Sequence, residues 1–214
     1  KILSDDWSEV EINSPEGTAA IQWLGDLVRE YKVSPPRTAL QQMGSAQMFM
    51  TGRVAMGHYG RYMLPAFNQI KAFDFDIQHH PYGPKGTRGV PYGAATLSIG
   101  ATTKHPEEAW TFAKYLSGLK GQAIMNEVGN SIPVLNSIVQ TDEFKNPSCN
   151  PKHQWRMIEA VEYARLIPSP PGNAELMKIA QSEIDKVLLG VQTATQATEN
   201  IKTRGDAALK DALK

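Results

Sequence analysis

The sequence predicts an α/β protein that contains more helix than strand. Apolar residues recur at helical spacing over much of the chain, as at Leu24, Leu27, Val28 and Tyr31, which is the pattern of an amphipathic helix. Over 73–80, apolar and polar residues alternate instead, which is the period of a half-buried strand. We therefore expect helices for most of the chain and short strands near 53–57, 74–79 and 93–100.

Residues that favour helix ends support several of these helices. Ser14 and Pro15 supply a capping serine and a proline at the first helical position. A second helix is expected over 106–118, from a proline to a glycine. Thr193 and Gln196 have the spacing of a capping box. A last, alanine-rich helix is therefore expected to begin there.

A glycine- and proline-rich stretch, 81–93, precedes the third expected strand. It contains G-x-x-G-x-x-G but lacks the G-K-[ST] ending of a phosphate-binding loop. We interpret it as a connection between two lobes. The segment that follows, 94–101, is small, uncharged and without alternation, which favours a strand covered on both faces.

Composition excludes some partner classes. The chain has 214 residues, 22 of them basic and 22 acidic, so its formal net charge is zero. This balance gives no electrostatic footprint for nucleic acid or an anionic membrane surface. Its apolar runs are too short to span a membrane. The lone Cys149 excludes an internal disulfide and is interpreted as incidental rather than catalytic.

No motif in the sequence indicates catalysis, a cofactor or a metal. Serine-hydrolase, zinc-protease, C-x-x-C, Walker and dinucleotide patterns are all missing. Asp74 and Asp76 would share one strand face, where a solvated surface is favoured over a metal or acid–base pair because no third ligand lies at useful spacing. His79 and His80 would point to opposite faces and could not hold one metal together. These absences favour a binding protein over an enzyme.

The stretch 49–63, FMTGRVAMGHYGRYM, is a candidate ligand edge. Gly57 and Gly60 bracket His58 and Tyr59, so little side-chain bulk lies near a backbone that an aromatic face adjoins. The alternative is a tight strand-turn-helix corner with an ordinary packing tyrosine. The residues alone leave both open.

Five stretches in order resemble one known family. They are FMTGRVAMGHYGRY at 49–62, FDFDIQHHPYGPKG at 73–86, GAATLSIGATTKHPEEAWTFAKYLSG at 93–118, GNSIPVLNS at 129–137, and a helical tail ending ALKDALK. This series resembles the extracellular solute-binding proteins of ABC importers, in the sugar-binding branch related to maltose-binding protein. Members of that family are roughly twice as long, so the chain is expected to be a C-terminal fragment. A piece beginning KILSDDW would not show a signal peptide or a lipid anchor.

The resemblance implies a fold, a location and partners. Residues 1–90 and 136–214 would form the C-terminal lobe of a two-lobe periplasmic-binding-protein fold, and 91–135 would cross into the other lobe. The protein would be periplasmic or extracellular, membrane-tethered at full length, and would deliver a sugar or oligosaccharide to ABC transporter permease subunits. No cofactor is implied. The alternatives are an unrecognised carbohydrate-active hydrolase, with Asp74/Asp76 or Glu107/Glu108 as acids, and a helical interaction module built on 151–214.

The resemblance also implies site residues. The aromatic beyond the "GkvAM" strand, here Tyr62, would stack on a pyranose ring. Other candidates near it in sequence or at the crossover are Arg61, Gly60, His58, Tyr92 and Gly93. A covering role for Tyr62 on its own helix is the alternative. Because the other lobe is missing, we expect weak ligand binding by this chain alone and self-association through 91–135.

Overall fold

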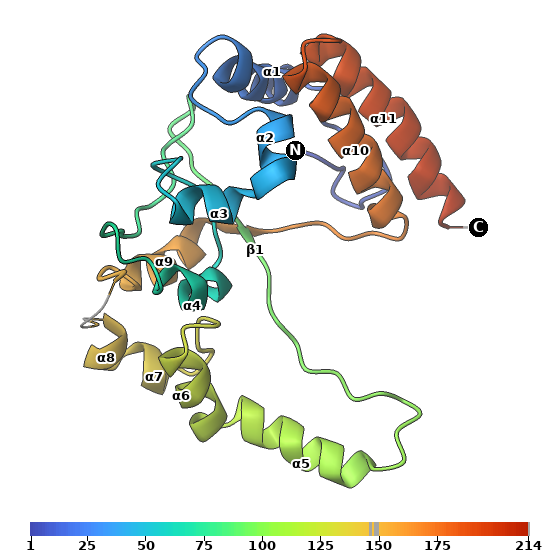
Figure 1. The fold of residues 1–214 in the computed structure, drawn as a ribbon. Coiled ribbons are helices and arrows are strands. Elements are labelled where there is room, and N and C mark those ends of the chain that lie inside the picture. Colours follow the sequence, from blue (N-terminus) through green and yellow to red (C-terminus); the bar gives the residue numbers. More distant parts are fainter. Residues whose placement is uncertain (146, 148–149, 214) are drawn as a thin grey trace. The chain divides into compact units, whose positions relative to one another are not determined.

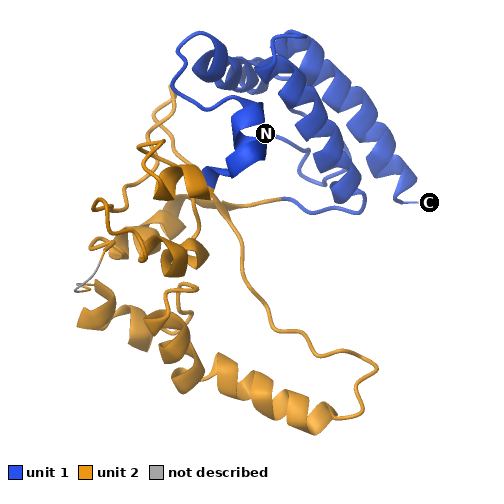
Figure 2. Cartoon of the chain, in the orientation of Figure 1, with its two compact units in different colours: residues 1–45, 168–214 blue, residues 46–167 orange. Residues whose placement is uncertain are grey.

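The chain folds into two units, which a computed structural model describes for residues 1–145, 147 and 150–213 (Figure 1). Unit 1 comprises residues 1–45 and 168–214, and unit 2 comprises residues 46–167 (Figure 2). Cys149 lies outside the described residues. These units are defined within this chain, so the expected lobe boundaries at 90/91 and 135/136 stay a prediction.

Two helices of unit 1 begin at the caps that the sequence predicts. Ser14 Oγ accepts a hydrogen bond of 3.2 Å from the Gly17 amide at the start of the first helix. Thr193 and Gln196 form the predicted capping box, with bonds of 3.2 and 3.0 Å. Each cap satisfies helix amides that lack an intrahelical partner. The helices are α1 (Pro15–Arg29), α2 (Arg37–Met43), α10 (Asn173–Leu188) and α11 (Ala194–Asp211).

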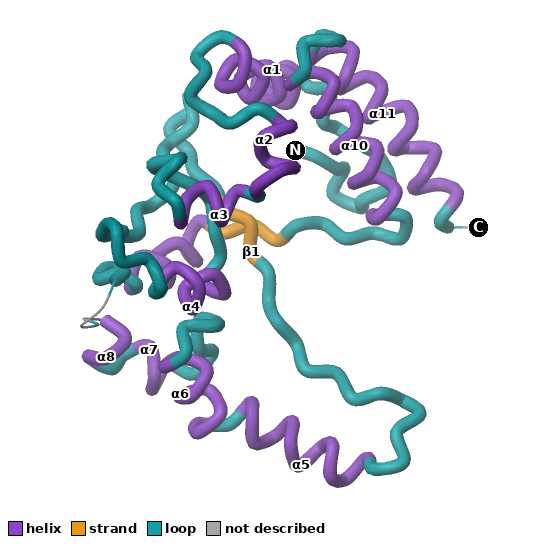
Figure 3. The backbone as a smooth tube through the Cα atoms, viewed as in Figure 1, coloured by secondary structure: helices purple, strands orange, loops and turns teal. Residues whose placement is uncertain are grey.

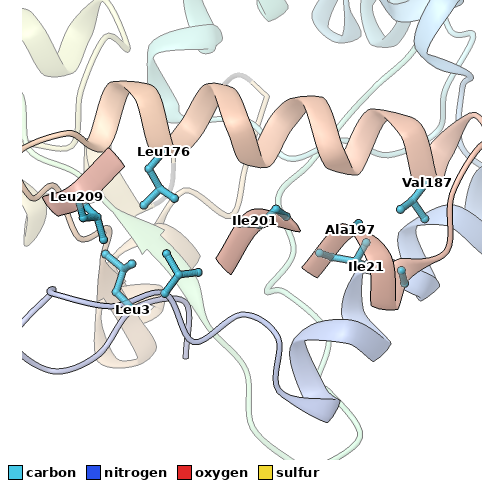
Figure 4. Close-up of a cluster of buried hydrophobic side chains, with 9 residues drawn as sticks. Leu3, Ile21, Leu176, Val187, Ala197, Ile201 and Leu209 are labelled. Carbon is cyan, nitrogen blue, oxygen red and sulfur yellow. The ribbon is translucent and has the colours of Figure 1, made fainter. Parts of the chain in front are cut away.

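The core of unit 1 lies between α1, α10 and α11. α10 and α11 pack along each other, and both contact α1. The N-terminal segment joins them through an antiparallel bridge between Leu3 and Val10. The apolar stripe of the C-terminal tail is therefore used within its own unit, which disfavours a separate helical interaction module. The buried cluster (Figure 4) consists of Leu3, Val10, Ile21, Leu176, Val187, Ala194, Ala197, Ile201 and Leu209.

Unit 2 combines short helices with long extended segments (Figure 3). Its strands, β1 (Val90–Tyr92) and β2 (Ala164–Leu166), pair in parallel with Val90 opposite Ala164. The long connection between them carries most of its helices. In chain order the helices are α3 (Ser45–Met50, which begins at the unit boundary), η1 (Arg61–Met63), α4 (Leu64–Phe67), α5 (Pro106–Ser117), α6 (Leu119–Glu127), α7 (Asn136–Val139), α8 (Asp142–Lys145), α9 (Trp155–Glu159) and η2 (Ala160–Tyr163).

An aromatic cluster surrounds Phe49, at the C-terminal end of α3. Its ring centroid lies 5.1 Å from that of Phe67 and 5.6 Å from that of Tyr59. The rings of Phe73 and Phe75 meet it edge-on at 5.8 and 6.0 Å. These distances and tilts are those that aromatic pairs prefer. The cluster joins α3, α4, the glycine-rich corner (residues 57–62, GHYGRY) and the segment 73–75.

The fold class is confirmed, but all three expected strands are wrong. Residues 53–57, 74–79 and 93–100 form no strand. The segment 73–79 keeps the predicted alternation, with Phe73, Phe75, Ile77 and His79 half-buried and the residues between them exposed. Segment 93–100 is exposed throughout, not covered on both faces. A strand needs a neighbouring backbone to complete its hydrogen bonds, and the described chain offers these segments none.

The observed strands also lie where none was expected. β1 falls within the predicted connection 81–93, and β2 interrupts a region whose sequence pattern predicts helix. Their pairing joins residues more than 70 positions apart, which no local pattern can predict. Among the described residues, no helix combines the length and apolar character needed to cross a membrane.

Candidate functional site

The glycine-rich corner, GHYGRY, contains two copies of the motif Gly-x-Tyr. A Cβ on Gly57 would lie 2.2 Å from the ring of Tyr59, and one on Gly60 would lie 2.5 Å from the ring of Tyr62. Gly60 has φ −83° and ψ 163°, which any residue adopts. The glycine at position 60 is therefore needed for the space that the tyrosine ring occupies, not for its backbone conformation.

A cavity of about 190 Å³ lies in unit 2 beside this corner. The corner, the extended segment 75–80, and the stretch from α9 into η2 form most of its wall, which Phe49, Leu64, Phe67 and Val90 complete. Two of the predicted site residues, His58 and Gly60, line it. The polar residues around it are His58, Tyr59, Asp76, Gln78, His79, His80, Arg156 and Tyr163.

The histidines of the cavity wall have different partners. His79 lies 2.7 Å from the Tyr163 hydroxyl through Nδ1 and 2.8 Å from the Glu159 carboxylate through Nε2. The ring of His80 meets that of His58 edge-on, with centroids 4.7 Å apart. Burial, together with the neighbouring His58, lowers the pKa of His80. His79 and His80 thus have separate partners, although both line one cavity.

Asp74 and Asp76 dock a distant segment and do not form a purely solvated face. Asp74 accepts a hydrogen bond of 2.6 Å from the Asn150 side chain. Asp76 accepts bonds from the amide and the ring Nδ1 of His153. Burial alone would raise the pKa of Asp76, but these bonds outweigh it and lower that pKa. The described residues contain no group of three or more metal-ligating side chains.

Arg61 is buried, with 6% of its surface exposed. Its Nη2 donates to the carbonyl and side-chain oxygens of Asn126 at 3.2 and 2.9 Å and to Gln154 at 3.0 Å. Its Nη1 donates to the Ser131 carbonyl, and the guanidinium lies 5.4 Å from the ring centre of Phe144. Burial lowers its pKa to about 10. The guanidinium is thus held by neutral protein groups.

The remaining predicted residues are open to solvent. Tyr62 exposes 66% of its surface and Tyr92 exposes 44%. Tyr92 ends β1 two positions after Val90, which lines the cavity, so both belong to the same face of the strand. Gly93 begins the exposed segment 93–100. No contact among the described residues links Tyr92 or Gly93 directly to Tyr62, and their ligand-binding roles stay predictions.

Part of the cavity wall was not predicted from the sequence. Arg156 and Tyr163 come from a helical region some 80 positions away from the segment that they contact. Arg156 donates a bond of 2.7 Å to the Ile77 carbonyl. The alternation over 73–80 indicated which residues turn inward, but no local signal identified their partners.

Aromatic rings, imidazoles and one side-chain amide gather around this small cavity, an arrangement typical of ligand-binding proteins. Residues 1–152 match the family model described as bacterial extracellular solute-binding protein. The match covers more than half of the chain, so the chain belongs to that family.

Solved structures of binding proteins share this fold. The ABC substrate-binding protein Lmo0181 from Listeria monocytogenes, in complex with cycloalternan, is 23% identical with a TM-score of 0.86, over 98% of this chain and 53% of that chain. The GacH receptor of Streptomyces glaucescens, solved unliganded and with acarbose, is 21% identical with a TM-score of 0.83, over 99% and 54%. Maltose-bound MalE3 of T. maritima is 21% identical with a TM-score of 0.79, over 95% and 53%.

The chain spans about half the length of each of these proteins. They have two lobes, and the helix-rich chain with its small sheet matches part of that architecture. The expected fold class is therefore confirmed. At this level of identity, the likeness concerns the fold, not the ligand.

Proposed function

We propose that the intact protein binds an extracellular sugar or oligosaccharide and delivers it to the permease subunits of an ABC importer. Family membership supports a solute-binding role, and the similar structures were solved with cycloalternan, maltose and acarbose. The observation that carries the proposal is the exposed ring of Tyr62, which packs against Gly60, a residue of the cavity wall.

The chemistry of this surface suits a sugar. A pyranose ring presents C–H groups that pack on a flat aromatic face, while its hydroxyls need polar partners. Tyr62 supplies the face, and His58, on the cavity wall, supplies a donor or acceptor. Tyr92 and the open backbone of Gly93 are the further candidates. Arg61 contributes less directly, because its guanidinium is occupied by protein acceptors.

The rest of the ligand surface would come from the other lobe. In this proposal, residues 1–90 and 136–214 belong to one lobe and 91–135 cross to the other. A cavity of about 190 Å³ is smaller than pockets that bury whole ligands, which are on the order of 300–1,000 Å³. Closure of a second lobe would supply the missing cover. Location outside the cytoplasmic membrane, with a membrane tether, belongs to the same proposal.

The test is Tyr62→Ala in the intact protein, titrated with maltose by calorimetry. Loss of a stacking face should weaken binding by about 1–3 kcal/mol, with little change in melting temperature because the ring is exposed. Tyr31→Ala is the matched control, since Tyr31 is also exposed, at 59%, and lies in unit 1. Unchanged affinity with a lowered melting temperature would make Tyr62 a packing residue.

A sugar panel separates binding from hydrolysis. Thermal shift with maltose, α-D-tagatose, acarbose and cycloalternan would report binding, and released reducing sugar would report an enzyme. A hydrolase needs two acids roughly 5–10 Å apart in a pocket. Asp74 and Asp76 instead hold the segment 150–153, and Glu107 and Glu108 lie in the first turn of α5. These positions support a binder. Sugar release that Asp76→Asn abolishes would overturn it.

Self-association of this chain is a second part of the proposal. α5 exposes Trp110, Phe112 and Tyr115 at 53%, 62% and 49%, and exposed apolar patches commonly mark an interface. Exchange of the segment 91–135 between two copies would cover them. Light scattering should show a dimer at high concentration. A clean monomer would contradict the exchange.

A further inference from the structure

We propose that Gly60 and Arg61 are positioning residues: together they hold the ring of Tyr62 in the orientation that faces ligand. The effect on binding rests on the proposed function, while the effect on the ring does not. Both residues were predicted above as ligand contacts. The structure gives each of them a different task.

Gly60 leaves the space that the ring of Tyr62 occupies. Two carbons of the Tyr62 ring lie 2.5 and 2.7 Å from where a Cβ of Gly60 would stand, which is closer than real Cβ contacts allow. Any larger residue at position 60 would push the ring away. Because Tyr62 is exposed, the ring can turn into solvent without disturbing a core. The cost of the substitution is therefore a change of orientation, not of stability.

Arg61 anchors the backbone between Gly60 and Tyr62. It is the first residue of η1, between Gly60 and Tyr62, and its side chain is buried whereas that of Tyr62 is exposed. Its bonds reach the end of α6 at Asn126, the loop at Ser131, and Gln154. Three separate segments thus grip one side chain. Because the Arg61 guanidinium is fixed by these bonds, the backbone of the turn has little freedom, and the Tyr62 ring keeps its orientation.

The neighbouring Gly-x-Tyr motif, residues 57–59, serves as an internal comparison. Gly57 leaves the same kind of space for the ring of Tyr59, but that ring packs inward, 5.6 Å from Phe49 and 5.0 Å from Phe67. The core holds Tyr59. Tyr62 exposes most of its surface, so its own turn must supply the orientation. This difference gives a role to the buried Arg61, which lies between the glycine and the tyrosine of the second Gly-x-Tyr motif.

The first test observes the ring without ligand. The intact protein is labelled with ¹³C in its tyrosine rings, and the Tyr62 signal is assigned by its loss in Tyr62→Ala. Gly60→Ala should move that signal and leave the melting temperature within about 2 °C. Gly89→Ala is the matched control, because a Cβ there meets nothing within 4 Å; it should leave the signal in place. An unmoved Tyr62 signal in Gly60→Ala would overturn the proposal.

The second test measures coupling to binding, with maltose as the probe. Gly60→Ala should weaken binding about as much as Tyr62→Ala, and adding it to Tyr62→Ala should cost nothing further. Additive losses would show that Gly60 contacts the sugar itself and would refute a positioning role. Absence of maltose binding by the unaltered protein would count against the proposed function alone, since the ring signal still decides the inference.

Arg61 is tested with two variants, because replacing a buried arginine risks the fold. Gln154→Leu removes one acceptor and keeps the arginine; Arg61→Lys keeps the charge but loses the forked geometry. Both should broaden or shift the Tyr62 ring signal, Arg61→Lys the more. If both variants fold and leave that signal unchanged, Arg61 stabilises unit 2 without positioning Tyr62.

Discussion

The carboxylate of Glu183 in α10 accepts a hydrogen bond of 2.7 Å from the guanidinium of Arg204 in α11. Lys186 donates to the same carboxylate at 2.6 Å, and Gln192 and Asn200 each donate at 3.0 Å. Glu183 itself has no exposed surface. A buried carboxylate with this many donors is well satisfied, so it joins α10, α11 and the turn between them.

Glu183→Gln should destabilise unit 1 by about 2–4 kcal/mol, because it removes the charge that several donors share. Urea denaturation measures the loss. Glu175→Gln is the matched control on the same helix, since its ion pair with Lys178 is 3.5 Å long and exposed; it should cost less than about 0.5 kcal/mol. Equal losses in the two variants would refute a special role for Glu183.

The same carboxylate predicts a pH dependence. Burial alone would raise its pKa, but the bonds from Lys186, Gln192 and Asn200 outweigh it and lower the pKa from 4.5 to about 2. A carboxyl group whose pKa is lowered by folding stabilises the fold at pH values above its unfolded-state pKa. This stabilisation is lost as the pH falls toward the folded-state pKa. Stability of unit 1 should therefore fall between about pH 4.5 and pH 2. The fall should be shallower in Glu183→Gln; parallel pH curves would contradict this.

Gly205→Ala should destabilise unit 1 although alanine favours helix. A Cβ at position 205 of α11 would lie 2.7 Å from Leu176 and 2.8 Å from Val10, both buried. Overpacking costs about 1–3 kcal/mol, against a gain of up to about 1 kcal/mol in helix propensity. We expect a net loss of about 1 kcal/mol by urea denaturation. A stabilised variant would show that Leu176 and Val10 can move aside.

The 214-residue chain by itself should bind maltose weakly or not at all. It spans about half the length of the similar binding proteins, and in the proposed function a second lobe would cover the cavity beside Gly60. Burial of the ligand contributes much of the affinity of such sites. Calorimetry of this chain beside the intact protein measures the difference. Submicromolar binding by the chain alone would show that its own surface suffices.

The helix ends were predictable because their causes are local. Ser14 and the Thr193–Gln196 pair bond amides within three residues of themselves, so a short window of sequence contains cause and effect. The glycine-rich corner was predicted as a candidate ligand edge, and that role stays a prediction. The inward set Phe73, Phe75, Ile77 and His79 was predictable for the same reason, since alternation belongs to the extended backbone itself.

By itself, then, the sequence determined the helix-rich class, the caps, the alternation and the aromatic corner, all of which depend on neighbours in the chain. Tertiary structure decided the rest. It paired Val90 with Ala164, left 93–100 without a partner, turned Arg61 inward to Asn126 and Gln154, and set Tyr62 over Gly60 on the exposed side. Strand pairing and burial depend on contacts between distant residues, whose loop-closure cost and geometry no short pattern encodes.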